Sequence, residues 1–180
     1  MQSIRTEKLT LRPFVMDDIE TVHSYISDGE NAKYLLFATD SRDDTKAFIE
    51  KAIEDYSEVP LRNYNYAIEL NENSKHIGGC SIMIDADGSE AEVGWVIRKE
   101  YWGRGLGTLI AQMLIKHGFE QLGLRRIYAA CDSENVGSYR VMEKNGMRRE
   151  GYFVKSRLSR GQYKDELYYA ILREEWEGAE

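Results

Sequence analysis

Residues 101–108, YWGRGLGT, carry glycines at Gly103, Gly105 and Gly107, directly before a segment with a helical apolar stripe. The first turn of a helix presents unpaired backbone N–H groups and a partial positive charge. Glycines at this point let an anion approach the backbone without a Cβ in the way, and Arg104 can add a charge-assisted hydrogen bond. The stretch predicts a phosphate-binding turn between a strand and a helix; the alternative is a tight turn without a ligand.

Two common phosphate-binding motifs fit this stretch poorly. A P-loop ends in Gly-Lys-Ser/Thr, whereas the last glycine here is followed by Thr108 alone. The dinucleotide fingerprint G-x-G-x-x-G has different spacing and opens a βαβ unit, whereas several strands joined by hairpins are expected before this stretch. Asp132, at the end of the following strand, keeps a dinucleotide site as a weak alternative.

Apolar periodicity predicts a mixed sheet with helices on its faces. The expected strands cover 9–14, 64–70, 76–84, 91–97, 125–132 and two long segments that flank 159–162. The expected helices begin near Asp17 or Asp18, at Ser41, at Leu106 and at Asn135. Residues 29–40 are expected to be irregular, and residues 173–180 are expected to fray.

Composition restricts the class of protein. A chain of 180 residues suits one domain, and a net charge of −7 argues against a general binder of nucleic acid or anionic membranes while permitting a cationic substrate. No apolar segment resembles a signal peptide or a membrane span, so a cytoplasmic protein is expected. Cys80 and Cys131 lie in apolar runs and are expected in the core, and His23, His76 and His117 lack metal-ligand spacing, so no metal is expected.

Three segments in sequence order resemble the GNAT acetyltransferases. WGRGLGT resembles motif A, Q/R-x-x-G-x-G/A; NVGSYRVMEKNGM at 135–147 resembles the helix-and-turn segment N-x-x-S-x-R-x-x-E-K-x-G-F; and AEVGW resembles the strand before motif A. The resemblance spans nearly the whole chain and favours the RimJ/RimL-like subgroup, which acetylates ribosomal-protein N-termini. It implies an α/β (α+β) GNAT fold over residues 1–180, with a mostly antiparallel twisted sheet of about seven strands, helices on both faces and a splayed parallel pair.

The resemblance also implies acetyl-CoA as the acetyl donor. The backbone amides expected to hold its pyrophosphate are those of Arg104, Gly105, Leu106, Gly107 and Thr108. The pantetheine arm is expected to pair as an added strand with free backbone at Trp95, Val96 and Ile97, and to bond Asn135, which can equally be a helix N-cap.

Two positions depart from the family pattern. Trp102 stands where motif A has Gln or Arg. Met142 stands where many members have a tyrosine that protonates the departing thiolate. RimL-like members are expected to use a helix serine instead, which matches Ser138 here, although a structural serine is an equal alternative.

Glu92 is the candidate general base. Strand alternation directs Glu92 away from Val93 and Trp95, so those apolar side chains are expected to hold the strand without desolvating the carboxylate. The alternatives are a solvated or ion-paired glutamate, and Glu90 on the same face is a weaker choice. The residues expected to wall the acceptor site are Tyr34, Phe37 and Tyr163, with core or dimer contacts as alternatives.

These features together predict an acetyl-CoA-dependent N-acetyltransferase in which a primary amine attacks the thioester directly. A backbone N–H near Val96 would stabilise the oxyanion. A peptide N-terminal α-amino group is the expected acceptor, and an aminoglycoside, polyamine or amino acid is the alternative. A CoA-binding module without turnover is a further alternative. A monomer or homodimer is expected, with neither nucleic acid nor membrane as a partner.

Overall fold

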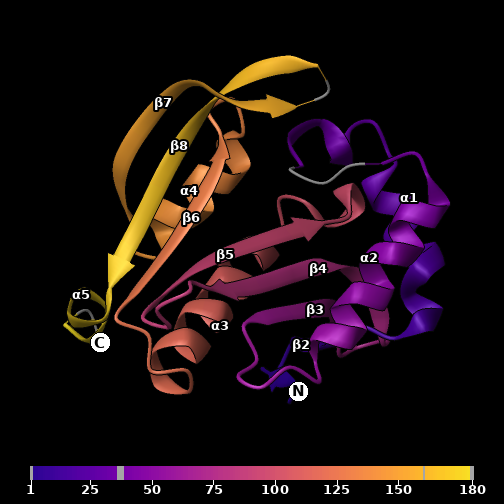
Figure 1. Ribbon diagram of the computed structural model, residues 1–180, viewed down its shortest axis with the longest axis horizontal. Coiled ribbons are helices and arrows are strands. Elements are labelled where there is room, and N and C mark those ends of the chain that lie inside the picture. The colour runs from indigo at the N-terminus through magenta and orange to yellow at the C-terminus, as the bar shows by residue number, and fades with distance from the viewer. Residues whose placement is uncertain (1, 36–38, 160, 179–180) are drawn as a thin grey trace. The chain divides into compact units, whose positions relative to one another are not determined.

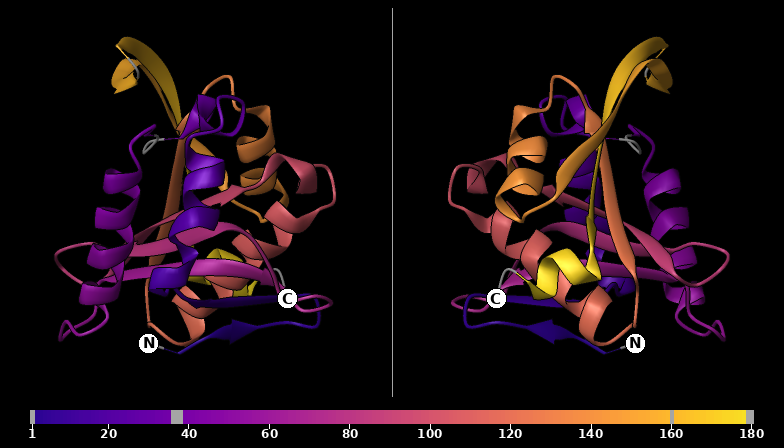
Figure 2. Two further views of the ribbon diagram at one scale, coloured as in Figure 1. Left: turned by 90° about the vertical axis from the view of Figure 1, so that its right-hand side faces the viewer. Right: turned by 90° about the vertical axis from the view of Figure 1, so that its left-hand side faces the viewer.

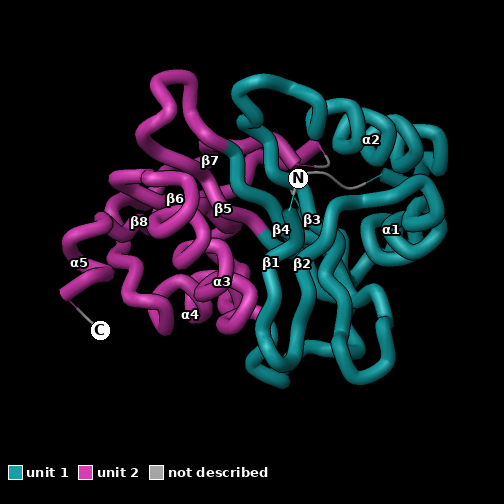
Figure 3. The backbone as a smooth tube through the Cα atoms, turned by 90° about the horizontal axis from the view of Figure 1, so that it is seen from below, with its two compact units in different colours: residues 1–83, 95–106 teal, residues 84–94, 107–180 magenta. Residues whose placement is uncertain are grey.

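The computed structural model describes residues 2–35, 39–159 and 161–178, and its described strands follow the sheet order β1-β2-β3-β4-β5-β6-β8-β7 (Figure 1). Contacts divide the chain into two compact units, residues 1–83 with 95–106 and residues 84–94 with 107–180 (Figure 3). The mixed, mostly antiparallel sheet is confirmed. It contains one strand more than expected, because the short β1 pairs with β2. A single domain over residues 1–180 stays a prediction.

The helices and strands alternate as the periodicity predicts. Their bounds in chain order are β1 (Ile4–Arg5), β2 (Leu9–Pro13), η1 (Met16–Asp18), α1 (Ile19–Ile26), η2 (Asn31–Tyr34), α2 (Arg42–Asp55), β3 (Asn63–Leu70), β4 (Lys75–Ile84), β5 (Glu90–Ile97), η3 (Lys99–Tyr101), α3 (Leu106–Glu120), β6 (Arg126–Asp132), α4 (Val136–Lys144), β7 (Arg148–Ser159), β8 (Gln162–Leu172) and α5 (Arg173–Glu177).

In the first unit, α1 and α2 pack with β2 and β3 around one apolar cluster. The buried members of the cluster are Phe14, Ile19, Val22, Tyr25, Ile26, Ile49, Ala52 and Ala67. Phe48 of α2 meets Phe14 edge to face, with ring centroids 5.8 Å apart. Figure 2 shows the first strands (indigo) at the edge of this sheet. Val96, near the end of β5, packs against the same cluster. This core therefore supports the end of the strand that leads to the glycine stretch.

A β-bulge in β4 brings the strand close to β5. The register with β3 shifts so that Ile77 is the extra residue between His76 and Gly78. An ideal Cβ on Gly78 would lie 2.1 Å from the backbone oxygen of Val96. The pair Gly78-Gly79 in the sequence indicates either a bulge or a close backbone approach, and the structure has the bulge at Ile77 and the close approach at Gly78.

Two buried polar side chains, Asp18 and His76, lie in contact at the start of β4. His76 Nδ1 lies 3.0 Å from an Asp18 oxygen and Nε2 lies 2.8 Å from the Gly78 carbonyl oxygen. Both partners of the ring are hydrogen-bond acceptors. Although burial opposes ionisation of Asp18, hydrogen bonds from Arg12 and His76 hold its pKa well below the usual range. Asp18, the last residue of η1, thereby joins Arg12 of β2 to His76 beside the bulge.

In the second unit, β5 and β6 are parallel only at their starts. The paired residues are Glu90 with Arg126, Ala91 with Ile127 and Glu92 with Tyr128. The pairing ends there, although β5 continues to Ile97 and β6 to Asp132. On its other edge, β6 pairs with β8 along its whole length. The parallel pair is thus confirmed over these three residue pairs, and the splaying of the two strands beyond them stays a prediction.

The C-terminal segment differs from the expectation. Residues 173–177 form α5 rather than a fraying tail. The Leu172 N–H donates to a Glu175 oxygen at 2.8 Å, and Arg173 Nε donates to the Leu124 carbonyl at 3.0 Å. The Trp176 ring lies 5.5 Å from the Phe119 ring. The contacts of Arg173 and Trp176 tie α5 to α3 and to the loop after it, and the sequence pattern did not indicate them because they join segments distant in the chain.

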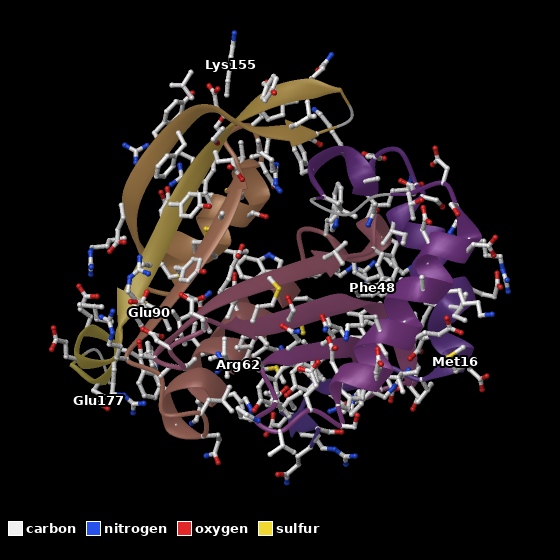
Figure 4. All side chains as sticks on the ribbon, in the orientation of Figure 1. Met16, Phe48, Arg62, Glu90, Lys155 and Glu177 are labelled. Carbon is white, nitrogen blue, oxygen red and sulfur yellow. The ribbon has the colours of Figure 1, made fainter. Side chains whose placement is uncertain are left out.

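The β7–β8 hairpin carries a wide irregularity. The register shifts between Phe153 and Arg157, and Lys155 adopts a positive φ of 48°. Its side chain projects away from the ribbon (Figure 4). The exposed apolar residues of this hairpin are Tyr152, Phe153, Val154, Leu158 and Tyr163.

Candidate active site

The glycine stretch forms a turn that only glycine adopts easily. Gly103 and Gly105 have φ values of 72° and 74°, and no atom lies within 4 Å of an ideal Cβ at either position. The turn opens directly into α3 at Leu106. Arg104 folds back, since its Nη2 donates to the Glu100 carbonyl at 2.8 Å and its guanidinium lies 5.1 Å from the Tyr101 ring. The side chain of Arg104 therefore braces the turn, and its role as an anion ligand stays a prediction.

The end of β5 is less free than expected. The Ile97 carbonyl accepts hydrogen bonds from Asn31 Nδ2 at 2.9 Å and from Trp102 Nε1 at 2.6 Å. The Arg98 N–H donates to the Ile77 carbonyl at 2.8 Å. The expectation of free backbone is thus wrong at the Ile97 carbonyl. Trp102, whose role the sequence left open, is a donor to β5.

Glu92 is half-buried on β5, beside Tyr128 in the parallel register. No hydrogen bond or ion pair engages its carboxylate among the described residues. Burial raises the pKa of Glu92, and the negative charges of Glu166 and Asp85 add to the rise. Burial therefore desolvates the carboxylate, and the expectation that Val93 and Trp95 take no direct part in this desolvation stays a prediction. Glu92 is a stronger base than an ordinary glutamate once it is ionised.

Polar and aromatic groups surround Glu92 on the same unit. Tyr128 donates its hydroxyl to Asp85 Oδ1 at 3.1 Å, and burial together with Asp85 raises the pKa of Tyr128 to about 12. Glu166 is buried and accepts from Ser156 Oγ at 2.8 Å. Burial is the largest cause of the raised pKa of Tyr168 on β8, and the negative charges of Glu166 and Glu92 raise it further. This acidic and aromatic face is suited to a cationic acceptor.

Glu90 is engaged in ion pairs. Its carboxylate meets the guanidinium of Arg126 at 2.7 Å and also that of Arg125. The side chain lies at the start of β5 (Figure 4). Two arginines engage the Glu90 carboxylate, whereas the Glu92 carboxylate has no partner among the described residues, so Glu92 is the better placed of the two glutamates on this face.

The start of α4 holds the two predicted helix residues. Asn135 is the N-cap, and its Oδ1 accepts from the Ser138 N–H at 3.1 Å. The capping alternative for Asn135 is confirmed, and within the described ranges its Nδ2 donates no hydrogen bond. Ser138 is half-buried. Met142 is almost fully buried, with 1% of its surface exposed, so its thioether belongs to the core and donates no proton.

The predicted acceptor residues have mixed outcomes. Tyr34 is half-buried in η2, and Lys33 Nζ lies 4.8 Å from its ring centroid. Tyr163 is 64% exposed at the start of β8. Phe37 lies outside the described residues. A role for Tyr34 or Tyr163 in binding the acceptor stays a prediction.

Sequence reasoning missed Asn31, Asp85, Tyr128 and Glu166. Alternation places Tyr128 on the face opposite the buried Ile127, but its proximity to Glu92 follows only from the parallel register of β5 and β6. Glu166 reaches the site through the pairing of β6 with β8. Asn31 lies in a segment without periodicity, so no pattern signalled it.

Over the described ranges, no helix has the length and apolarity needed to cross a membrane. Within the same ranges, no group of three or more histidine, cysteine, aspartate or glutamate side chains has the arrangement of a metal site.

Comparison with known proteins gives one consistent match. A family model described as an acetyltransferase (GNAT) domain matches residues 8–148. The uncharacterized N-acetyltransferase YnaD of Bacillus subtilis (strain 168) is 36% identical over 96% of this chain and 98% of its own length. The crystal structure of a GNAT-family acetyltransferase from Bacillus anthracis has a TM-score of 0.84 and 36% identity, with 96% of this chain and 99% of that chain covered.

Two more distant relatives carry names that mention an acceptor. YdaF of Bacillus subtilis (strain 168), provisionally named a ribosomal N-acetyltransferase, is 28% identical over 96% of this chain and 95% of its own length. The spermidine N(1)-acetyltransferase of Escherichia coli (strain K12) is 25% identical over 92% of this chain and 87% of its own length.

Proposed function

The chain belongs to the GNAT family of acetyltransferases, and we propose that it transfers the acetyl group of acetyl-CoA to the α-amino group of a peptide or protein N-terminus. The observation that carries the proposal is Glu92, a half-buried carboxylate with a raised pKa and no partner among the described residues, at the point where β5 and β6 part. A neutral amine must attack the thioester, and Glu92 is the group that can remove the proton of the incoming ammonium.

The residues of the chain fit acetyl-CoA. At Gly103 and Gly105 the backbone is left-handed and open, which gives a phosphate room to reach the N–H groups of residues 104–108. We expect an extended pantetheine arm to pair with the backbone of β5 at Trp95 and Val96, in the manner of an added strand. When bound, acetyl-CoA supplies the activated acetyl thioester.

Each remaining residue has a defined task in this proposal. Glu92 accepts the proton of the ammonium, through a water molecule. The Val96 N–H stabilises the oxyanion that forms on the acetyl carbonyl. Asn135 Nδ2 bonds the pantetheine, because its Oδ1 is already used as the helix cap. Ser138 protonates the departing thiolate, since Met142 cannot.

Proton affinity favours an α-amino acceptor over a lysine-like one. Deprotonation at pH 7 costs about 1 to 1.4 kcal/mol for an α-amino group and roughly 4 to 5 kcal/mol for a lysine-like amine. Because the pKa of Glu92 is raised, the difference between the pKa of this base and the pKa of the incoming ammonium is smaller than for an ordinary glutamate. The name of the relative YdaF supports the same acceptor class.

A small polyamine is the second candidate acceptor. Asp85 and Glu166 lie near Glu92 and would attract further ammonium groups, and one relative is named a spermidine acetyltransferase. We expect a peptide with a free N-terminus to have a higher kcat/KM than spermidine or than an Nα-blocked peptide with a lysine. Initial rates of CoA release with the three acceptors at pH 7 decide between them. Turnover with spermidine alone would replace the peptide proposal.

Substitution of Gly105 by valine tests the phosphate-binding loop. The new side chain would occupy the space above the loop amides, so the Kd for CoA should rise roughly 10- to 100-fold through lost charge-assisted hydrogen bonds. Calorimetry of the folded variant measures the change. Gly88→Val is the matched control, because Gly88 has a similar φ of 78° and equally open surroundings in a different turn. Equal CoA affinity in both variants would contradict the assignment of this loop.

A further inference from the structure

Asn31 imitates one peptide group of a neighbouring strand. Its side chain is buried in η2, where Nδ2 donates to the Ile97 carbonyl at 2.9 Å and Oδ1 accepts from the Lys99 N–H at 3.0 Å. Donation to one residue and acceptance from the residue two further along is the pattern by which a parallel strand pairs. The amide of Asn31 thus closes the backbone edge at the end of β5.

Trp102, which follows β5 in the chain, supplies a second hydrogen bond to the same carbonyl as Asn31. Its Nε1 donates to the same Ile97 carbonyl at 2.6 Å. A carbonyl oxygen has two lone pairs, so Asn31 and Trp102 together satisfy it fully. Trp102 also ends η3 and directly precedes Gly103, which ties the end of β5 to the first residue of the glycine turn.

Asn31 and Trp102 fix the segment that joins two parts of the proposed acetyl-CoA site. Residues 97–99 follow directly on Val96 and lead through η3 to the turn at Gly103 and Gly105. Because peptide groups are planar, a fixed Ile97 carbonyl fixes the plane of the Ile97–Arg98 peptide. Rotation of this peptide would displace the backbone of the loop that follows.

We propose that Asn31 is a positioning residue for acetyl-CoA and that Trp102 acts with it. They hold the Ile97 carbonyl away from the cofactor, so that the N–H edge at Val96 and the loop amides after Gly103 keep a fixed relative placement. The inference rests on the proposed function, because it assumes that these backbone groups bind acetyl-CoA. No motif of the family resemblance includes Asn31.

A plain tether is the competing explanation, and the chain provides a control for it. Lys99 Nζ pairs with Asp28 at 3.0 Å and with Glu30 at 3.4 Å. These pairs join the same two segments through exposed side chains without touching the Ile97 carbonyl. Lys99→Met removes the tether and keeps the amide pattern, whereas Asn31→Asp keeps the shape and the acceptor but loses the donor to Ile97.

The test compares CoA affinity with stability. Asn31→Asp should raise the calorimetric Kd for CoA and the KM for acetyl-CoA roughly 5- to 100-fold, because it leaves the Ile97 carbonyl short of a donor and facing a carboxylate. The same variant should change kcat less than KM. Lys99→Met should leave the CoA Kd within about twofold, as expected of an exposed ion pair. Trp102→Phe removes the other donor from an exposed position and should weaken CoA binding in the same direction.

The outcomes separate a failure of the positioning role from a failure of the proposed function. Unchanged CoA affinity in folded Asn31→Asp and Trp102→Phe, with a wild type that binds CoA, would overturn the positioning role alone. If Lys99→Met loses as much CoA affinity as Asn31→Asp, Asn31 acts only as a tether between the two segments, and the positioning role is overturned as well. A wild type that does not bind CoA would overturn the proposed function and this inference together. Faster hydrogen exchange of the Lys99 amide in Asn31→Ala than in wild type reports the lost acceptor independently of the cofactor.

Discussion

Glu92→Gln is expected to lower kcat with an amine acceptor by about 10² to 10⁴, the usual contribution of a general base. Glutamine keeps the shape of the side chain and cannot accept the proton. CoA affinity should stay nearly unchanged, because Glu92 lies on β5 and outside the glycine loop. Steady-state kinetics with calorimetry on the same preparation measures both quantities.

The pH profile gives the sign of the effect. A base works only when ionised, so kcat/KM should fall as pH drops through the pKa of Glu92. Burial and the charges of Glu166 and Asp85 raise that pKa, so the acidic limb should lie above the ordinary glutamate value of about 4.3. Glu92→Gln should remove this limb and leave the limb of the acceptor amine.

Asp85→Asn serves as the matched variant. It removes one of the negative charges that raise the pKa of Glu92, so the acidic limb should move to lower pH while the base remains. A Glu92→Gln enzyme with near wild-type kcat at pH 7, measured where chemistry limits the rate, would show that Glu92 is not the base. If the acidic limb of kcat/KM stays at the same pH in Asp85→Asn, the limb reports the titration of a group other than Glu92.

Gly78→Ala is expected to cause the largest loss of stability among small substitutions in β4. The added Cβ would lie 2.1 Å from the Val96 oxygen and 3.0 Å from the Ile97 Cα. Both are backbone atoms that cannot rotate away, so β4 and the end of β5 must separate. We expect a loss of about 3 kcal/mol or more in the free energy of unfolding, or a Tm lower by roughly 6 to 12 °C.

Gly79→Ala is the control for that substitution. Its Cβ would meet the Tyr25 hydroxyl at 3.1 Å and Phe14 Cζ at 3.3 Å. These are the ends of side chains, which can shift by a few tenths of an ångström, so the expected loss is below about 1.5 kcal/mol. Equal melting temperatures for the two variants would contradict the close approach of β4 to β5.

Local signals predicted most of the fold. Ser41 and Asn135 cap helices as expected, with their side chains accepting from Asp44 and Ser138. Gly123 and Gly146 follow α3 and α4 with φ values of 72° and 76°. Such signals act over a few residues, so the sequence displays them. The pair Gly78-Gly79 indicated a bulge or a close approach, but the position of the extra residue at Ile77 depends on the register with β3.

The candidate site divides in the same way. The glycine turn and Glu92 were visible because backbone conformation and strand alternation are local properties. The raised pKa of Glu92 was not visible, because its burial and the nearby charges of Glu166 and Asp85 depend on segments distant in the chain. The occupied Ile97 carbonyl was also missed, since its donors Asn31 and Trp102 come from irregular segments.

Direct detection of acetyl transfer tests the central claim. The protein is mixed with isotope-labelled acetyl-CoA and a peptide with a free N-terminus, and mass spectrometry follows the label on the peptide and on the protein while free CoA thiol is measured. We predict label on the α-amino group in proportion to released CoA, with no labelled protein, because the amine attacks the thioester directly. CoA binding without thiol release across peptide and small-amine acceptors, or an acetylated protein that precedes the product, would contradict the account.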